Sequence, residues 1–501
     1  MNSTTPLEGL LRDLRRFPLE EYDSPAAREL SAVLEAAPDT GELSRLGEGE
    51  RCQLLHRLVA ACVRARLQPL LSQNNIAHPV YNFLQSFEDN ADGPWDREPV
   101  RYEGSQRRDW SLLGHSIRYP IGVPASVLTA NHKWIRYFAR RGYNVLTYKS
   151  VRSIEYSGHP FPHWLFIENV DSPWYRDEDI EKVTGNDRTW PKSFDAFSTA
   201  NSFGVPSPPP VVWQNDVERS LDLLVPGQLL IVSVMGTAES TGTELVSDFA
   251  RVARLAAETG VPAIELNLSC PNTVDRETNA IQEPVCLSKT AVASIVDAVK
   301  EVTDTPLVLK LSSMPKDRLA DVVSSVAGKV QGVSGINTVQ ADVVNSEGDP
   351  VFLGTVHTPT EGSRAKAGVS GIAIREFGKQ FVRWLDDIRK ESSADFDIIG
   401  MGGVMNGHDV LSMRYSGAGA VQSATAAMVG TPLPEQAEHL EEIHTAVLNS
   451  LGDGLWLDKA QIVSLVGVTP SVASVALDAL VEAGKVTAID DGRGRSRYSR
   501  N

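Results

Sequence analysis

The segment 264–272, Ile-Glu-Leu-Asn-Leu-Ser-Cys-Pro-Asn, holds the residues of this sequence best suited to chemistry. An apolar strand is expected over 263–268, and the turn after it places the Cys270 thiol between two carboxamides, Asn267 and Asn272. Carboxamides both donate and accept hydrogen bonds, so two of them can hold the edge of a flat, amide-like ring. A thiol beside that ring acts as a general base if its pKa lies near the working pH. The alternative is a buried, inert cysteine, which is the commoner case.

The elements that must position this turn follow a regular alternation from about residue 111 onward. Short β-branched runs alternate with helical patterns, which predicts parallel βα units. Strands are expected at 121–124, 145–149, 229–234, 263–268, 306–311, 335–339, 397–401 and 419–423, with helices at 131–141, 245–259, 287–302, 316–327, 372–391 and 408–416. Eight such units predict an α/β fold, a (β/α)8 TIM barrel over 111–450. A stretch at about 157–212, rich in Trp, Pro and Asp, interrupts the pattern and is interpreted as an insertion on the catalytic face, either a lid or a subunit contact.

Polar residues and glycines recur where the expected strands end, and this end of a barrel is where functional residues lie. They are Ala125, Ser126, Lys149, Ser150, Asn267, Cys270, Lys310, Asn337, Thr338, Gly402, Gly403, Ala424 and Thr425. The loops after the seventh and eighth strands are the usual phosphate site of this architecture, and glycine permits close approach of the backbone to an anion. Gly371, just before a helix, is placed to close the same pocket. Two lysines beside carboxamides indicate a site for a flavin and a polar ring.

These residues resemble the FMN-dependent dihydroorotate dehydrogenases over about 115–430, in the soluble subfamily that uses cysteine as the base; the membrane-associated subfamily has serine there. The matching motifs include Lys149-Ser150, Gly158-His159-Pro160-Phe161-Pro162, Asn201-Ser202-Phe203-Gly204, the Cys270 loop and Gly402-Gly403. The sequence departs from the family at Val127 and Ala424, where glycine is usual.

The resemblance implies a role for each matching residue. FMN would be bound by Ala125, Ser126, Lys149, Ser150, Asn267, Lys310, Gly371, Gly402, Gly403, Ala424 and Thr425. The pyrimidine would be bound by Lys149, Asn201, Asn267, Asn272, Asn337 and Thr338, with the backbone near Phe203 and Gly204. Cys270 would remove a proton from C5 of dihydroorotate while C6 gives a hydride to flavin N5. Lys149 would orient the ring, and Lys310 would stabilise reduced FMN.

Two other functions stay open on the sequence. The same chemistry could act on another dihydropyrimidine or related ring, although the related dihydropyrimidine dehydrogenases need cysteine-rich cluster domains. This chain has Cys52, Cys62, Cys270 and Cys286 and no C-x-x-C pair, so we expect no metal site. The other function is a flavin- or ligand-sensing regulator that binds DNA, which the intact Cys–Lys–Asn set disfavours. Cys52, Cys62 and Cys286 are interpreted as structural.

The ends of the chain suggest appendages to the barrel. Residues 1–110 are expected to be a helical extension, with an amphipathic helix around 51–72 that packs on protein rather than on a membrane. Residues 452–501 predict a winged-helix-like module: helices at 455–466 and 472–483, a strand at 486–489, and a wing with Arg493, Arg495, Arg497 and Arg500. We interpret the module as a packing unit, with DNA contact as the alternative.

The overall composition points to a soluble protein. The formal charge of −16 over 501 residues argues against wrapping nucleic acid. No signal peptide or membrane-spanning run is apparent, so we expect a cytoplasmic protein, without a membrane, that forms a homo-oligomer, most simply a dimer. The expected partners are a small pyrimidine substrate and an external electron acceptor, which the sequence does not name.

Overall fold

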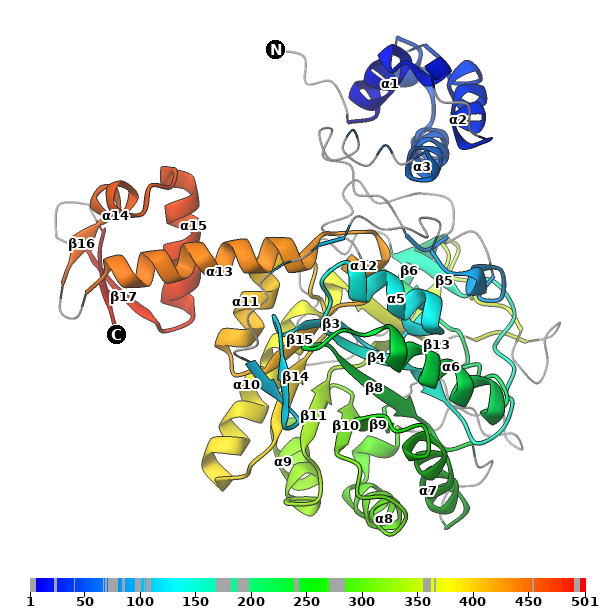
Figure 1. Cartoon of the computed structure of the whole chain (residues 1–501), viewed down its shortest axis with the longest axis vertical. Helices are drawn as coiled ribbons and strands as arrows, with labels where there is room; N and C mark the ends of the chain where they lie inside the picture. The colour runs from blue at the N-terminus through cyan, green and yellow to red at the C-terminus, as the bar shows by residue number, and fades with distance from the viewer. Residues whose placement is uncertain are drawn as a thin grey trace.

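The computed structural model describes residues 6–21, 25–39, 41–65, 67, 70, 80–82, 86–94, 101–102, 104, 110–167, 182–186, 198–237, 243–269, 284–354, 362–364, 366–452, 455–490 and 496–501. Its centre is a closed barrel of parallel strands surrounded by helices (Figure 1). The strands, in their order around the barrel, are β3 (Ile121–Val123), β4 (Val145–Val151), β8 (Leu229–Val234), β9 (Ala263–Asn267), β10 (Leu307–Leu311), β11 (Gly332–Gly335), β14 (Asp397–Gly400) and β15 (Ala420–Gln422). The prediction of a (β/α)8 TIM barrel is confirmed.

Helices follow the strands and cover the barrel on the outside. They are α5 (His132–Arg140), α6 (Pro210–Leu223), α7 (Thr243–Ala257), α8 (Lys289–Lys300), α9 (Lys316–Ser325), α10 (Arg375–Ser392), α11 (Gly407–Tyr415), α12 (Thr425–Met428) and α13 (Leu433–Ser450). Local signals start several of them: the Asn131 side chain caps α5, Ser288 caps α8 and Asn406 caps α11. The strands β4, β8, β9 and β10 are buried along their whole length because helices and interior side chains cover both faces.

A hairpin closes the end of the barrel opposite the catalytic face. It consists of β1 (Trp110–Leu112) and β2 (His115–Ile117), which pair antiparallel. Leu112 and Ile117 pack into an apolar cluster with side chains from the barrel strands, including Ile231 and Val308. The Leu113 amide donates to an Asp397 carboxylate oxygen at 2.6 Å.

The prediction for the sixth strand is wrong by several residues. It was expected at 335–339, whereas β11 ends at Gly335. Glycine has little intrinsic preference for strands, so 332–335 gives a weak signal. The packing requires a small residue, since a Cβ at Gly335 would lie 2.4 Å from the Phe381 ring of α10. The β-branched residues that follow belong to a different sheet.

That second sheet stands on the barrel and contains five strands closed into a ring. They are β5 (Trp164–Ile167), β6 (Lys182–Asn186), β7 (Ser198–Asn201), β12 (Val339–Val344) and β13 (Lys366–Gly371). Three strands come from the insertion expected at about 157–212, and two come from a second insertion, after β11, which was not predicted from the sequence. The helix α6 was also missed, because its Pro-rich start resembles the end of the insertion.

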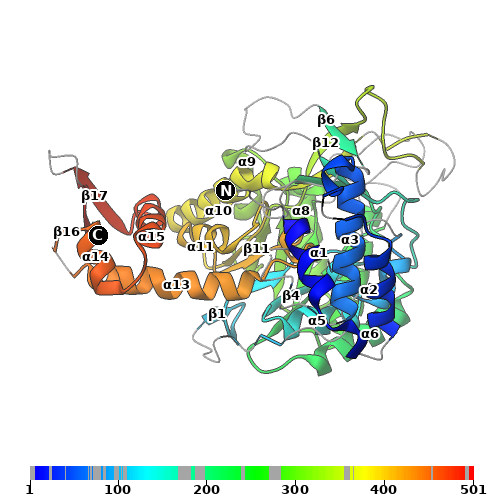
Figure 2. The same cartoon turned by 90° about the horizontal axis from the view of Figure 1, so that it is seen from above.

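The N-terminal helices form a unit with an apolar core of its own. They are α1 (Pro6–Arg16), α2 (Pro25–Glu35) and α3 (Glu48–Arg64), and Leu10, Leu14 and Leu58 are fully buried among them. The unit stands above the barrel in Figure 1 and overlies it when seen from above in Figure 2. The expected helix at 51–72 is described only up to Arg64 as a continuous element. Residues 80–82, by contrast, pack on the barrel, where Val80 and Tyr81 join the main core.

At the other end, a small module extends from the barrel on α13 (Figure 1). It contains β16 (Leu457–Asp458), α14 (Lys459–Val466), α15 (Pro470–Glu482), β17 (Val486–Asp490) and β18 (Ser496–Arg500), and its strands form an antiparallel sheet in the order β16–β18–β17. Thr469 caps α15 as expected. Arg493 and Arg495 lie outside the described residues.

Among the described residues, no single helix is both long and apolar enough to cross a bilayer. Only α14 and α15 taken together reach that length and composition, and they meet at a bend of 109°.

Candidate active site

One cavity lies at the C-terminal ends of the barrel strands, between the barrel and the second sheet. Every predicted site residue that the structure describes lines it: Ala125, Ser126, Lys149, Ser150, Asn201, Phe203, Gly204, Asn267, Lys310, Asn337, Thr338, Gly371, Gly402, Gly403, Ala424 and Thr425. These residues come from both insertions and from barrel strands that are far apart in the sequence. The fold therefore brings them together at a single place.

Glycines shape the part of the cavity formed by the loops after β13 and β14. Gly371, Gly402 and Gly403 have φ angles of 85°, 105° and 73°, which side-chain-bearing residues rarely adopt. A Cβ at Gly403 would lie 2.2 Å from Cα of Arg375, so there is no room for any other residue. Ala424 has φ −96° and ψ −54°, a conformation that alanine adopts freely, which explains why glycine is dispensable there. This arrangement leaves the backbone open to an anionic group.

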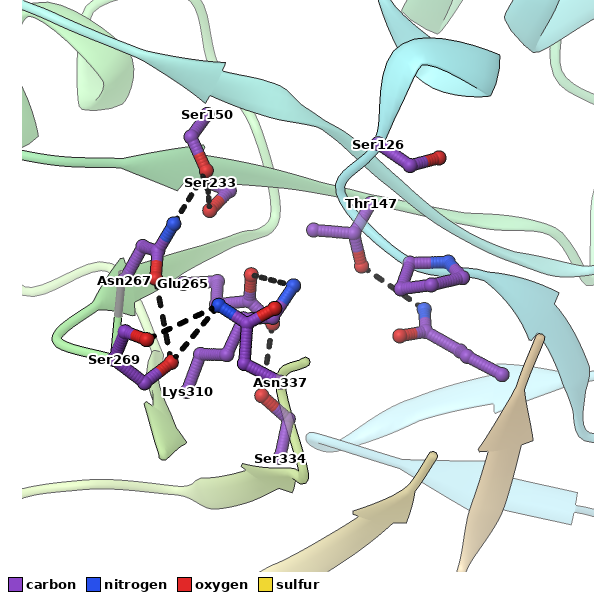
Figure 3. A network of polar contacts seen from close by, with 12 residues as sticks. Ser126, Thr147, Ser150, Ser233, Glu265, Asn267, Ser269, Lys310, Ser334 and Asn337 are labelled. Atoms are coloured by element: carbon purple, nitrogen blue, oxygen red, sulfur yellow. Dashed lines mark hydrogen bonds and ion pairs between the residues drawn. The ribbon is translucent and has the colours of Figure 1, made fainter. Parts of the chain in front are cut away.

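The carboxamides are held by hydrogen bonds that involve three strands, β4, β8 and β9, and the loops after β9 and β11 (Figure 3). The Asn267 side chain donates to Ser150 Oγ at 2.9 Å, and Ser150 Oγ lies 2.9 Å from Ser233 Oγ. The Asn337 side chain donates to Ser269 Oγ at 3.1 Å. Because these bonds fix the amide orientations before any ligand arrives, the site presents a preset pattern of donors and acceptors.

The second sheet supplies the opposite wall of the cavity. Asn201 ends β7, and its side chain donates to the Gly368 carbonyl of β13 at 3.2 Å. Thr338 packs against the same glycine, since a Cβ on Gly368 would lie 2.2 Å from Thr338 Oγ1. Gly368 thus lets two predicted substrate-binding residues approach one strand closely.

Two lysines contribute positive charge to the cavity, and both are nearly buried. Lys149 is 8% exposed, and its Nζ lies 5.7 Å from the centre of the Phe87 ring. Lys310 is 3% exposed, and its Nζ lies 3.8 Å from Glu265 Oε1. Among the described residues, no hydrogen bond to Lys310 Nζ is found, which leaves its donors available to a group in the cavity. An anionic or carbonyl-bearing planar ligand matches these charges.

Comparison with known proteins agrees with this geometry. The family model described as "Dihydroorotate dehydrogenase" matches residues 181–443. The chain is 29% identical over 371 residues to the dihydroorotate dehydrogenase of Dictyostelium discoideum, covering 70% of this chain and 95% of that protein. It is 26% identical over 326 residues to the catalytic subunit of dihydroorotate dehydrogenase B (NAD(+)) of Methanopyrus kandleri, covering 64% and 85% of the two chains.

The chain belongs to the dihydroorotate dehydrogenase family. It is therefore an oxidoreductase, and the family is flavin-dependent. The fold agrees with a solved structure of DHODH from Eimeria tenella in complex with ferulenol, at a TM-score of 0.51 and 16% identity, over 70% of this chain and 88% of that one. The matched family region ends at residue 443, so the C-terminal module lies beyond it.

Two of the expected dehydrogenase residues, Cys270 and Asn272, lie outside the described residues. Ser269, the last described residue before them, is fully buried and bonded to Asn337. The roles of Cys270 and Asn272 stay predictions.

Two of the remaining cysteines, Cys62 and Cys286, do not line the cavity. Cys62 and Cys286 are free and fully buried. Burial raises the pKa of Cys62 to about 12 and also raises the pKa of Cys286, whose sulfur lies 3.1 Å from Ser312 Oγ. These environments keep both thiols protonated and inert. The side chain of Cys52 lies outside the described residues.

Several residues in or next to the cavity were not predicted from the sequence as site residues. Trp164 and Gln422 line the cavity, and Glu265 and Ser334 lie behind Lys310. A carboxylate within the otherwise apolar strand 263–268 was a usable signal for Glu265. No sequence signal marked Trp164, because its position depends on the pairing of β5 with β7.

An arginine of the second insertion, Arg364, holds two loops near the cavity together. The guanidinium of Arg364 donates to the carbonyls of Pro160, Pro162 and Ser202 at 3.0–3.3 Å. Arg364 is 5% exposed, and burial lowers its pKa to about 10, which still leaves it charged at neutral pH. It therefore ties the Gly158–Pro162 motif to the loop that carries Phe203 and Gly204.

Proposed function

We propose that this chain is an FMN-dependent dihydroorotate dehydrogenase that oxidises dihydroorotate to orotate in pyrimidine biosynthesis. The observation that carries the proposal is the convergence, on one cavity, of predicted residues from distant parts of the chain. A flavin-dependent family that includes the named relatives supplies the reaction class.

FMN fits the residues that line the cavity. The positive φ angles of Gly371, Gly402 and Gly403, and the start of α12 at Thr425, suit a phosphate group. Lys310 has a nearly buried ammonium whose pairing with Glu265 is long, so it suits the electron-rich edge of the flavin ring. Ala125, Ser126, Lys149, Ser150, Asn267 and Ala424 would complete the cofactor contacts. FMN, when bound, would accept the hydride from C6 of the substrate at N5.

The substrate would lie between the carboxamides and the second sheet. Asn201, Asn267, Asn337 and Thr338 present donors and acceptors that suit a pyrimidinedione, and Asn272 is assigned to the same set from the sequence. Lys149 would bind the ring and its carboxylate, with the backbone at Phe203 and Gly204. Cys270 would take the C5 proton, because it stands where the soluble subfamily that the sequence resembles has its base.

The proposal is tested by mixing the FMN-loaded protein with dihydroorotate without oxygen. Rapid loss of the yellow colour of oxidised flavin, with orotate formed in equal amount, is the expected result. Bleaching by dihydrouracil and none by dihydroorotate would replace the proposed substrate with another dihydropyrimidine. Bleaching by neither would overturn the proposal.

Changing Cys270→Ala tests the base directly. We expect FMN binding to stay normal and the rate of flavin reduction to fall about 10²- to 10⁴-fold, as is typical when a general base is lost. Stopped-flow absorbance at the flavin band measures this rate. Cys286→Ala is the matched control, since it removes a buried thiol outside the cavity, and unchanged reduction in the Cys270 variant would remove the cysteine from the mechanism.

A further inference from the structure

A carboxylate and an ammonium group lie together in the barrel interior, next to the cavity. Glu265 is on β9 and is 1% exposed, Lys310 is on β10 and is 3% exposed, and Ser334 is on β11. The strand register places them close, since Lys310 pairs with Ser334 and Val308 with Glu265. Glu265 and Asn267 are two residues apart on β9 and so point to the same side of the strand. Figure 3 shows Glu265 reaching both Lys310 and Ser334.

The two carboxylate oxygens of Glu265 have different surroundings. Oε2 accepts a hydrogen bond from Ser334 Oγ at 2.8 Å. Oε1 lies 3.8 Å from Lys310 Nζ and, among the described residues, accepts no hydrogen bond. A buried carboxylate is costly unless a positive charge lies nearby, and Lys310 supplies that charge for Glu265.

The distance of this ion pair has a consequence for Lys310. At 3.8 Å the Lys310 ammonium is attracted to Glu265 but is not hydrogen-bonded to it. Its N–H groups therefore remain able to donate to a group that occupies the cavity. Lys310 is therefore held between a fixed negative charge on one side and the cofactor region on the other. The field that it exerts on the cavity is reduced by the opposite charge behind it.

We propose that Glu265 is a positioning residue that acts through Lys310 to lower the reduction potential of the bound flavin. This inference rests on the proposed function. Reduced flavin carries negative charge at the edge that Lys310 would contact, and a cation there favours reduction. The negative charge of Glu265 opposes that effect. It also fixes the place of the ammonium group in the barrel.

The test is the midpoint potential of FMN in the Glu265→Gln variant, measured by equilibration with a reference dye. Glutamine keeps the shape and an acceptor for Ser334 but removes the charge. We expect a shift to more positive potential, with FMN affinity, measured by quenching of flavin fluorescence, unchanged within a few-fold. Glu265→Asp keeps the charge but withdraws it from Lys310, and should give a smaller shift in the same direction.

Asp386→Asn is the matched control, because Asp386 is also largely buried and pairs with Arg389 and Lys390, but on α10 outside the barrel. It should leave the potential unchanged. A Glu265→Gln protein that binds FMN with an unaltered potential, or a control that shifts equally, would overturn the inference. If the Glu265→Gln protein does not fold, the Glu265→Asp variant serves as the test. An unchanged flavin potential in that variant would also overturn the role proposed for Glu265.

Failure of this inference is distinguishable from failure of the proposed function. The proposed function fails if the unaltered protein does not bind FMN or is not bleached by a dihydropyrimidine. The role proposed for Glu265 fails if the unaltered protein binds FMN and is bleached by a dihydropyrimidine, while the Glu265 variants have the same flavin potential as the unaltered protein.

Discussion

At the scale of single residues, Gly403 is a tightly packed point of the region proposed to bind the cofactor. Its φ is 73°, and a Cβ would lie 2.2 Å from the Cα of Arg375, which is backbone and cannot rotate away. The same arginine pairs with Asp409 at 3.1 Å, and this pair holds the start of α10 in place. A change at Gly403 must therefore move the loop after β14.

We expect Gly403→Ala to destabilise the protein and to abolish tight FMN binding. The positive φ alone costs about 1–2 kcal/mol for a residue with a Cβ, and overpacking adds roughly 1–3 kcal/mol. Urea unfolding and fluorescence titration with FMN measure the two effects.

Gly260→Ala is the matched control for Gly403→Ala. Gly260 has φ 74°, and no atom lies within 4 Å of its Cβ position. The Gly260→Ala variant should lose only the free energy of unfolding that the positive φ costs, and it should bind FMN with normal affinity. Equal losses in both variants would mean that close packing at Gly403 has no special role.

Single residues also show what the sequence could and could not predict. Asn267, Lys310 and Gly403 were identifiable because each follows or ends a clear strand, and strand ends meet at one face of a barrel. Glu265 was not identified as part of the site, because its importance depends on Lys310, a neighbour on the next strand. Trp164 and Arg364 were not identifiable, since their positions arise from pairing between two insertions.

At the scale of elements, the segment 86–94 joins the N-terminal part of the chain to the site. The Phe87 amide donates to His163 Nδ1 at 3.2 Å, and the Phe87 ring lies 6.4 Å from that of Phe203. The same ring is 5.7 Å from Lys149 Nζ. Burial lowers the pKa of His163, which keeps the ring neutral and able to accept this bond. The segment thus supports two predicted site residues from outside the barrel.

We expect Phe87→Ala to lower kcat/KM for dihydroorotate about tenfold. The aromatic and cation–π contacts are each worth about 0.5–1.5 kcal/mol, and 1.36 kcal/mol corresponds to roughly tenfold in rate. Steady-state kinetics with an artificial acceptor measure the loss. Phe161→Ala is the control, because Phe161 is 51% exposed on the neighbouring loop. If both variants lose activity equally, the contact with Lys149 is not the cause.

The element most relevant to the DNA alternative is α15, the second helix of the C-terminal module. Its exposed positions include Asp478 and Glu482, which phosphate groups would repel. Glu482 also lies 3.7 Å from Arg383 of α10, so this end of the helix faces the barrel. We therefore propose that the module packs on the enzyme rather than on nucleic acid.

At the scale of the whole molecule, α13 belongs to two cores. Leu433 and Ala437 pack with the barrel, whereas Val447 and Leu451 pack with Leu477 and other residues of the module. Between them His444 is fully buried and stacks on Tyr415 of α11, whose hydroxyl lies 2.9 Å from His444 Nδ1. Among the described residues, His444 Nε2 has no hydrogen-bond partner.

The buried His444 on α13 should make the free energy of unfolding depend on pH. Burial, with a smaller contribution from His408, lowers the pKa of His444 to about 4. The unfolded chain binds a proton near pH 6.5, so between about pH 6.5 and 4 unfolding takes up a proton and stability falls as pH falls. The full loss is about 3 kcal/mol.

Urea unfolding at pH 7 and pH 5 measures this dependence. His444→Gln should flatten it, whereas His439→Gln, at an exposed position of the same helix, should leave it as it is. An equal pH dependence in the protein and in the His444 variant would assign the effect to other groups.

The second sheet joins the two insertions into one structure. Strands from the first insertion pair with strands of the second, β7 with β13 and β6 with β12. Arg364 of the second insertion also donates a hydrogen bond to the Pro160 carbonyl of the first. An engineer who exchanged only one insertion with that of a relative would leave the partner strands with open edges, which invite aggregation. The two insertions would therefore have to be transferred together, because each supplies strands that pair with strands of the other.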